Sequence, residues 1–146
     1  MINLVLVAKD IVERELVSLK EETTASDAAK VMKQNHKGFA LVVSSSGDPV
    51  GIVTEWDFLS QIISEQKNPG EVKLKEIMSR NLVTVSSKDG IDVIAKLMAD
   101  RGVRRVLVTE NGKIIGAVTS KTILRRFEDY INNISAQIAR LQTPIF

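Results

Sequence analysis

Thr54 and Asp57 form the residue pair in this chain whose spacing best suits chemistry. They are three residues apart in the segment GIVTEWD (51–57), where an apolar strand gives way to the expected start of a helix. Both side chains therefore face the same helix N-terminus. A carboxylate there can accept two hydrogen bonds from vicinal hydroxyl groups, such as those of a ribose, while the threonine hydroxyl and the free amides face a phosphate.

The same spacing also has a purely structural interpretation. In a capping box the threonine oxygen accepts one free amide at the helix start and the acid accepts another. Thr24 and Asp27 share this spacing, so spacing alone does not separate a cap from a ligand site. In the second half of the chain the equivalent residues are Thr119 and Thr122. A hydroxyl cannot replace a carboxylate as a bidentate acceptor, and we therefore expect two chemically unequal sites.

Basic residues precede the second expected strand of each half: His36 and Lys37 in the first, and Arg101, Arg104 and Arg105 in the second. Such basic groups usually lie on a solvated surface. Strand alternation, however, sends Arg104 and Arg105 to opposite faces, and a cleft-facing arginine needs an anionic partner. His36 follows a helix, where its side chain either interacts favourably with the negative end of the helix dipole or contacts a phosphate.

Composition excludes several classes of protein. The 146 residues contain no Cys and one His, which excludes disulfides, thiolate zinc sites and multi-histidine metal sites. We find no nucleophile elbow and no phosphate-binding glycine loop, so we expect no enzyme. A net charge of +2 and 4% aromatic residues argue against nucleic-acid binding. The first apolar run, 4–8, is too short to span a membrane, so we expect a cytoplasmic protein.

An internal repeat positions these candidate residues. Shifting the sequence by 66 aligns ten identical pairs, among them Ile11 with Ile77 and Met32 with Met98. After a one-residue deletion, an offset of 65 aligns five more, including Gly51 with Gly116 and Thr54 with Thr119. The chain therefore consists of two copies of one sequence repeat.

Each copy has the same predicted order of elements. The first strands are expected at 16–19 and 82–85, the first helices at 26–35 and 91–101, and the hairpin strands at 40–43 with 50–53 and 106–108 with 114–118. Asn111 and Gly112 favour a tight hairpin turn. Second helices begin at Thr54 and Thr119.

These patterns predict an α/β (α+β) fold of two tandem β-α-β-β-α half-domains. One copy cannot cover both faces of its sheet, so we expect the two to pack by pseudo-twofold symmetry. The expected parts are repeat 1–66, linker 67–71, repeat 72–127 and a C-terminal amphipathic helix and tail, 128–146. The tail stripe packs on the chain's own core or on a second copy; it consists of Ile131, Ile134, Ile138 and Leu141.

The two copies together resemble a CBS-domain pair, also called a Bateman module. The resemblance covers roughly residues 7–127 and rests on the doubled pattern, on GIVTEWD (51–57), and on VRRVLV (103–108) with GAVT (116–119). It implies a stand-alone regulatory module that senses an adenosine-type ligand in the cleft between the repeats. AMP, ADP, ATP or S-adenosylmethionine would bind there non-covalently. It also implies a homodimer formed through the second helices, about 54–65 and 119–128.

The resemblance also assigns roles to individual residues. Asp57 would hold the ribose hydroxyls, Thr54 would contact ribose or phosphate, and Lys37 with His36 would face the phosphate. The rest of the first cleft would be lined by Ile52 and, from the opposite repeat, by Val83, Thr84, Val85 and Val106. The weaker second cleft would use Arg104 and Thr119, with a base pocket of Val17, Ser18 and Ala40.

Two other functions stay open. One is a ligand-free dimerisation or scaffold module that uses the isoleucine stripe to interact with a partner protein. The other is weak nucleic-acid binding, against which the small net charge argues; it would use Arg101, Arg104, Arg105, Arg125 and Arg126.

Overall fold

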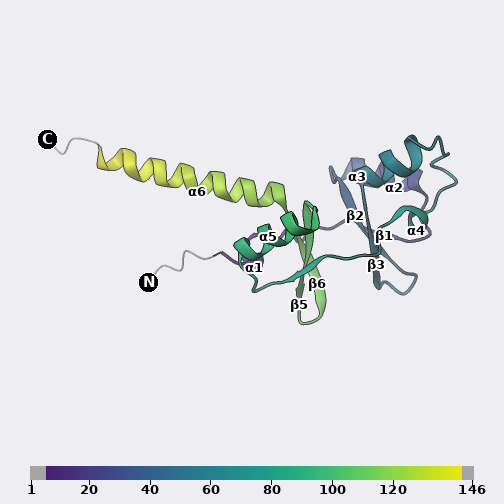
Figure 1. The fold of residues 1–146 in the computed structure, drawn as a ribbon, viewed down its shortest axis with the longest axis horizontal. Coiled ribbons are helices and arrows are strands. Elements are labelled where there is room, and N and C mark those ends of the chain that lie inside the picture. The colour runs from purple at the N-terminus through teal and green to yellow at the C-terminus, as the bar shows by residue number, and fades with distance from the viewer. Residues whose placement is uncertain (1–5, 143–146) are drawn as a thin grey trace. The chain divides into compact units, whose positions relative to one another are not determined.

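The computed structural model describes residues 6–142, which form two compact units (Figure 1). Unit 2 is the continuous stretch Glu15–Leu82, whereas unit 1 combines the chain up to Arg14 with the chain from Val83 onward. Each unit thus contains the body of one sequence repeat and the leading segment of the other repeat.

Unit 2 contains a three-stranded sheet in the order β1-β2-β3. β1 (Ser18–Lys20) runs parallel to β2 (Phe39–Val43), which pairs antiparallel with β3 (Pro49–Thr54). A parallel pair needs a crossover, which α2 (Ala25–Gln34) provides. After β3 come α3 (Glu55–Phe58), a π-helical turn (Leu59–Ile63) and, beyond the linker, α4 (Leu74–Ile77).

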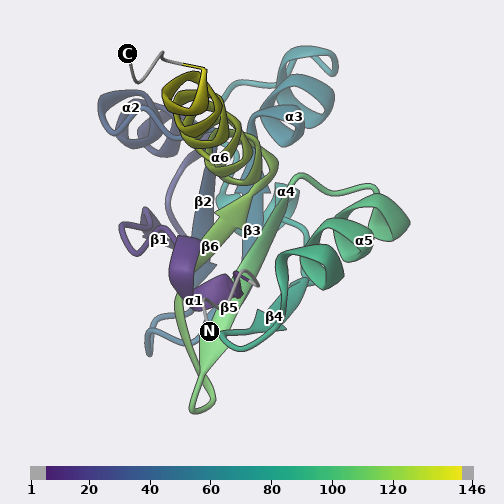
Figure 2. The same cartoon turned by 90° about the vertical axis from the view of Figure 1, so that its left-hand side faces the viewer.

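Unit 1 repeats this topology with β4-β5-β6. β4 (Thr84–Ser86) is parallel to β5 (Arg105–Glu110), and β5 is antiparallel to β6 (Lys113–Thr119). The hairpin tip at the bottom of Figure 2 has positive φ at Asn111 (53°) and Gly112 (77°), as the Asn-Gly pair predicts. The helices are α1 (Ala8–Ile11), α5 (Ile91–Arg101) and α6 (Ser120–Leu141). The predicted α/β class and repeated order of elements are confirmed.

The last helix differs from the prediction. The sequence pattern predicts a second helix ending near residue 128 and a separate tail helix, but α6 is a single helix of 22 residues. No Gly or Pro occurs between Ser120 and Leu141, so nothing in the sequence ends the helix earlier. In unit 2 the corresponding helix is short, because α3 passes into a π-helical turn after four residues.

The leading helices, which the sequence analysis does not predict, complete the two cores. Ile11 of α1 packs in unit 1 with Ile94 and Val106, and Ile77 of α4 packs in unit 2 with Val53. Ala8 and Leu74 are fully buried at the start of these helices. Each repeat therefore supplies core side chains to the unit built on the other repeat.

Two glycines allow these leading segments to lie against the sheets. Ile52 of β3 exchanges both backbone hydrogen bonds with Ser79, each 2.9 Å long, and Ala117 of β6 does the same with Glu13 at 3.0 and 2.9 Å. A Cβ on Gly51 would lie 2.6 Å from the Met78 Sδ. A Cβ on Gly116 would collide with the Glu13 carbonyl oxygen.

We expect Gly116→Ala to lower the free energy of unfolding by about 1–3 kcal/mol. The new Cβ would meet the Glu13 carbonyl oxygen, a backbone atom that cannot turn aside. Urea unfolding followed by circular dichroism measures the change. Gly70→Ala is the control, since its nearest atom lies at 3.4 Å in the Asn68 side chain and we expect a change within about 0.5 kcal/mol. Equal effects of the two substitutions would contradict the close approach.

Candidate functional site

The Asp57 carboxylate closes the start of α3. Its Oδ2 accepts the Thr54 backbone N–H at 2.8 Å and the Thr54 hydroxyl at 3.3 Å. Thr54 and Asp57 are both half-buried at the point where β3 ends. The expectation that both side chains face one helix N-terminus is confirmed. A carboxylate has about four acceptor positions, so this cap leaves Asp57 able to accept further donors.

Gln61 is a residue of this site that the sequence analysis misses. Its side-chain amide donates to Asp57 Oδ1 at 3.3 Å and to the Ile77 carbonyl oxygen at 2.9 Å. Gln61 therefore links the candidate carboxylate to α4, and it lies in the π-helical turn. The signal was available, since residues four apart on a helix share a face.

Other predicted residues of unit 2 lie beside this pair. The Glu55 N–H donates to the Gly38 carbonyl oxygen at 3.0 Å, which places Lys37 next to the helix start. Ile52 pairs with Leu41 of β2, and Leu41 in turn pairs with Ser18 of β1. The sheet thus brings Lys37, Ile52, Thr54 and Asp57 together in unit 2. Val17 and Ser18 lie at the next strand, β1.

His36 has a backbone role at the end of α2. Its φ is 53°, and the Lys37 N–H donates to the Met32 carbonyl oxygen at 2.9 Å, which closes the helix through a left-handed residue. The equivalent residue after α5 is Gly102, with φ 63°. His36 therefore lies at the C-terminal end of α2, and its side chain is exposed.

We expect His36→Gly to raise the free energy of unfolding by up to about 1 kcal/mol, because glycine adopts positive φ without a Cβ penalty. Gly102→His is the reciprocal control and should lower the free energy by a similar amount. Thermal unfolding of both variants measures this. A destabilised His36→Gly protein would show instead that the imidazole makes contacts worth more than the backbone penalty.

Unit 1 carries a different arrangement at the equivalent place. The Thr119 hydroxyl accepts the Thr122 backbone N–H at 3.1 Å, and the two threonine hydroxyls lie 2.9 Å apart. The Thr122 hydroxyl donates to Glu13 Oε1 at 2.7 Å. Glu13, which the sequence analysis does not select, thus brings a carboxylate to the site where Thr122 replaces the acid. It reaches this place because its backbone pairs with Ala117.

A hollow of about 250 Å³ adjoins Thr122 in unit 1. Ligand pockets usually measure about 300–1,000 Å³, so this hollow alone is small for a whole nucleotide. Its lining is mixed in charge and consists of Asp10, Ile11, Val12, Thr122, Arg125, Arg126 and Asp129.

The remaining predicted residues of unit 1 differ in exposure. Val83 is half-buried and Thr84 is exposed, whereas the side chains of Val85 and Val106 are 4% and 1% exposed within the core of the unit. Ala40, in unit 2, is likewise fully buried. These three residues therefore offer almost no surface to a ligand unless a core rearranges.

The predicted basic positions of unit 1 also separate. Arg104 is exposed, and its carbonyl oxygen accepts the Ser120 N–H at 2.9 Å. Arg105 begins β5 beside Thr119 and is half-buried. Because β5 begins at Arg105, Arg104 precedes the strand, and the two arginines differ in exposure.

Within residues 6–142, no cluster of three or more His, Asp or Glu side chains has the geometry to hold a metal ion. No helix in the same range combines the length and apolar character needed to cross a membrane.

The contact between Glu13 and Thr122 predicts a charge conflict. Thr122→Asp places a second carboxylate beside Glu13, and we expect the repulsion to cost about 1–4 kcal/mol of unfolding free energy at pH 7. Glu13→Gln in the same chain should restore most of it. A double-mutant cycle by urea unfolding isolates this coupling, with Thr122→Asn as the uncharged control. A coupling near zero would contradict the placement of Glu13.

The family model described as "CBS domain" matches the chain twice, over residues 8–64 and 74–129. The first match includes Thr54 and Asp57, and the second includes Thr119 and Thr122.

Two curated relatives differ in length. Uncharacterized protein MK0525 of Methanopyrus kandleri is 32% identical over 137 residues, which cover 93% of this chain and 70% of that protein. Homoserine O-acetyltransferase of Methanohalobium evestigatum is 30% identical over 122 residues, which cover 83% of this chain. The chain spans only 24% of the length of that enzyme.

A solved structure has the same fold with ligands bound. It is the CBS domain pair of protein MJ0100 in complex with 5′-methylthioadenosine and S-adenosyl-L-methionine. The TM-score is 0.76 at 26% sequence identity, and the alignment covers 86% of this chain and 98% of that chain.

Proposed function

Because the chain belongs to the CBS-domain family, we propose that it is a regulatory module that binds an adenosine-type ligand non-covalently beside Asp57. The observation that carries the proposal is the half-buried Asp57 carboxylate, held by Thr54 where β3 ends. The similar CBS pair of MJ0100 binds two adenosine derivatives, 5′-methylthioadenosine and S-adenosyl-L-methionine. AMP, ADP and ATP share the same nucleoside.

The cap and the proposed ligand role of Asp57 are compatible. Oδ2 accepts the two Thr54 donors, and Oδ1 accepts the Gln61 amide at 3.3 Å, a long hydrogen bond. A ribose diol donates two hydrogen bonds to a carboxylate, and charge-assisted bonds of this kind are the stronger ones. Lys37, next to the helix start, would supply positive charge for a phosphate.

We further propose that unit 1 provides a second, weaker ligand position at Thr119. Its carboxylate would come from Glu13, which lies 2.7 Å from the Thr122 hydroxyl, rather than from the helix. This arrangement supports a second site with different preferences, because Glu13 already accepts from Thr122 and its carboxylate projects from the leading segment.

Regulation in this proposal depends on unequal affinity. A ligand shifts a conformational equilibrium only when it binds one arrangement of the protein better than another. Ligand at Asp57 contacts the start of α3 and, through Gln61, the Ile77 carbonyl oxygen at the end of α4. The binding energy would therefore act on the packing of α4 within unit 2.

We expect Asp57→Asn to weaken AMP binding by about 10- to 100-fold, because loss of the charge weakens two hydrogen bonds to the ribose. Calorimetry with AMP, ADP, ATP, S-adenosylmethionine and 5′-methylthioadenosine measures the affinities. Trp56, the single tryptophan of the chain, adjoins Asp57 and is a fluorescent reporter. Binding of 2′-deoxy-AMP should be weak already and should change little in the Asp57→Asn protein.

Asp27→Asn is the matched control. Asp27 occupies the same position relative to Thr24 at the start of α2, where the Thr24 hydroxyl accepts the Asp27 N–H at 3.2 Å. The Asp27→Asn protein should bind AMP with the affinity of the unmodified protein. Absence of binding by all five ligands to folded protein would refute the proposed function, whereas binding that Asp57→Asn leaves unchanged would refute only the assigned site.

A further inference from the structure

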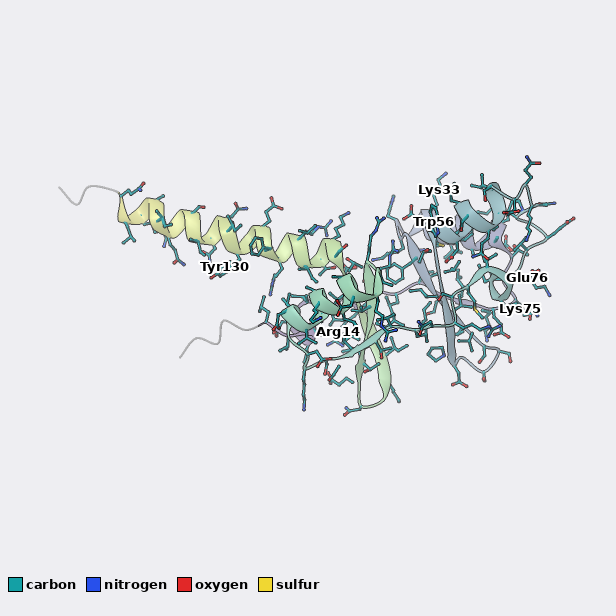
Figure 3. All side chains as sticks on the ribbon, viewed as in Figure 1. Arg14, Lys33, Trp56, Lys75, Glu76 and Tyr130 are labelled. Atoms are coloured by element: carbon teal, nitrogen blue, oxygen red, sulfur yellow. The ribbon has the colours of Figure 1, made fainter. Side chains whose placement is uncertain are left out.

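The Gln61 side chain connects the candidate carboxylate to α4 within unit 2. Its amide nitrogen donates to Asp57 Oδ1 at 3.3 Å and to the Ile77 carbonyl oxygen at 2.9 Å. Gln61 and Asp57 are half-buried, and Ile77 is 3% exposed. Figure 3 shows Trp56 on α3 and Lys75 on α4, the two helices that this contact links. A primary amide has two N–H donors, so this contact, which we call the Gln61 bridge, uses both of them.

The Gln61 bridge fixes an orientation that the aspartate side chain does not fix by itself. The torsion that turns a carboxylate plane is broad, because it joins a tetrahedral carbon to a planar one. Thr54 holds Oδ2 through its N–H at 2.8 Å and its hydroxyl at 3.3 Å. Gln61 holds the other oxygen, Oδ1, from the π-helical turn. With both oxygens held, the Asp57 carboxylate has one preferred plane.

The acceptor positions of Asp57 limit how a ribose binds to it. A carboxylate has about four acceptor positions, and donors of Thr54 and Gln61 occupy three of them. A ribose diol brings two donors, so one present contact must give way. The Thr54 hydroxyl can turn to the ligand, because hydroxyl hydrogens rotate freely. The planar Gln61 amide cannot leave Oδ1 without disturbing its 2.9 Å bond to Ile77, so the Gln61 bridge stays in place.

The second repeat lacks this bridge. The offset of 65 residues places Arg126 at the position of Gln61. The hollow of unit 1 is lined by the equivalents of all three residues of the bridge, which are Thr122, Arg126 and Ile11. The space that the Gln61 amide spans in unit 2 is therefore open in unit 1. The bridge thus accompanies the repeat whose helix carries the acid.

On the basis of the proposed function, we infer that Gln61 is a positioning residue for ribose recognition in unit 2. It holds the Asp57 carboxylate in the plane in which each oxygen meets one hydroxyl of the diol. Without the amide the carboxylate turns about its bond to the Thr54 N–H, and one of the two ribose bonds is lost. Gln61 therefore sets the preference of this site for a ribonucleotide over its 2′-deoxy form.

The test compares ribose and deoxyribose binding at the unit 2 site. Trp56 adjoins Asp57 and is the single tryptophan of the chain, so its fluorescence reports this site. Titrations use the tightest-binding of AMP, ADP and ATP, together with the 2′-deoxy form of the same nucleotide. Gln61→Met keeps the length of the side chain and removes both donors. It should weaken binding of the ribonucleotide by about 3- to 10-fold and of the deoxynucleotide by less than about 2-fold.

Ser64→Ala is the matched control. The Ser64 hydroxyl donates to the Ser60 carbonyl oxygen at 2.6 Å, so this variant also loses a side-chain hydrogen bond at the π-helical turn, but one that does not reach Asp57. It should change neither affinity. Gln61→Glu is a second variant of unchanged size, and it should also lower the ratio of the two affinities, because a carboxylate at residue 61 cannot donate to Asp57.

Two further measurements separate positioning from a general structural role. In the Asp57→Asn protein, Gln61→Met should change ribonucleotide affinity by less than about 2-fold, since Gln61 acts through the carboxylate. In the ligand-free protein, the NMR resonances of the Gln61 side-chain amide should shift on Asp57→Asn and stay in place in the Ser64→Ala protein. Resonances that ignore Asp57→Asn would contradict the bridge itself.

The possible results distinguish this inference from the proposed function. A Gln61→Met protein that keeps the ratio of the two affinities, loses both equally or binds the ribonucleotide more tightly overturns the inference alone. An unmodified chain that binds both forms equally does the same. A folded chain that binds none of the three nucleotides also overturns the inference, and it refutes the proposed function when S-adenosylmethionine and 5′-methylthioadenosine fail to bind as well.

Discussion

The close backbone approach at Gly51 and Gly116 is the constraint on which the rest of the structure depends. It lets each leading segment add a short antiparallel bridge to the third strand of a sheet. Through that bridge Ile11 and Ile77 reach the two cores. The candidate sites depend on it too, since Gln61 donates to the Ile77 carbonyl oxygen and Glu13 accepts from Thr122. Core packing and site chemistry therefore share one geometrical condition.

Sequence reasoning recovers the features that depend on local pattern. The repeat predicts the order of strands and helices, and α5 spans Ile91–Arg101 as its apolar period indicates. Thr54 and Thr119 are found at the starts of α3 and α6 because an N-cap depends on neighbouring residues only. The same local logic identifies the hairpin turn at Asn111 and Gly112.

The features that sequence reasoning misses are short or non-local. α1 and α4 have four residues each, too few to show a helical period. The sequence repeat does not reveal that each leading segment packs in the unit built on the other repeat. The same offset between the two copies would be seen if each leading segment packed with its own repeat. Glu13 lies 109 residues from Thr122, so only the strand pairing of the folded unit brings them together.

The two repeats use one backbone arrangement for different electrostatics. In unit 2 the carboxylate is on the helix, at Asp57, and the leading segment contributes the neutral Ser79. In unit 1 the helix has the neutral Thr122, and the leading segment contributes the carboxylate of Glu13. An acid at both places would set two like charges at hydrogen-bond distance, which is costly in a half-buried setting. Each unit therefore keeps one of the two.

The helices that begin at these sites end in different ways, and this affects how far a local change can reach. After α3 the chain passes through a π-helical turn and a linker with Asn68, Pro69 and Gly70, so the rigid element at Asp57 is short. α6 continues for 22 residues, about 33 Å, without a helix-breaking residue. Thr119, Thr122 and the exposed apolar side chains of α6 thus belong to one continuous element. The first turn of α6 is therefore continuous with its last, whereas the helix at Asp57 is interrupted after four residues.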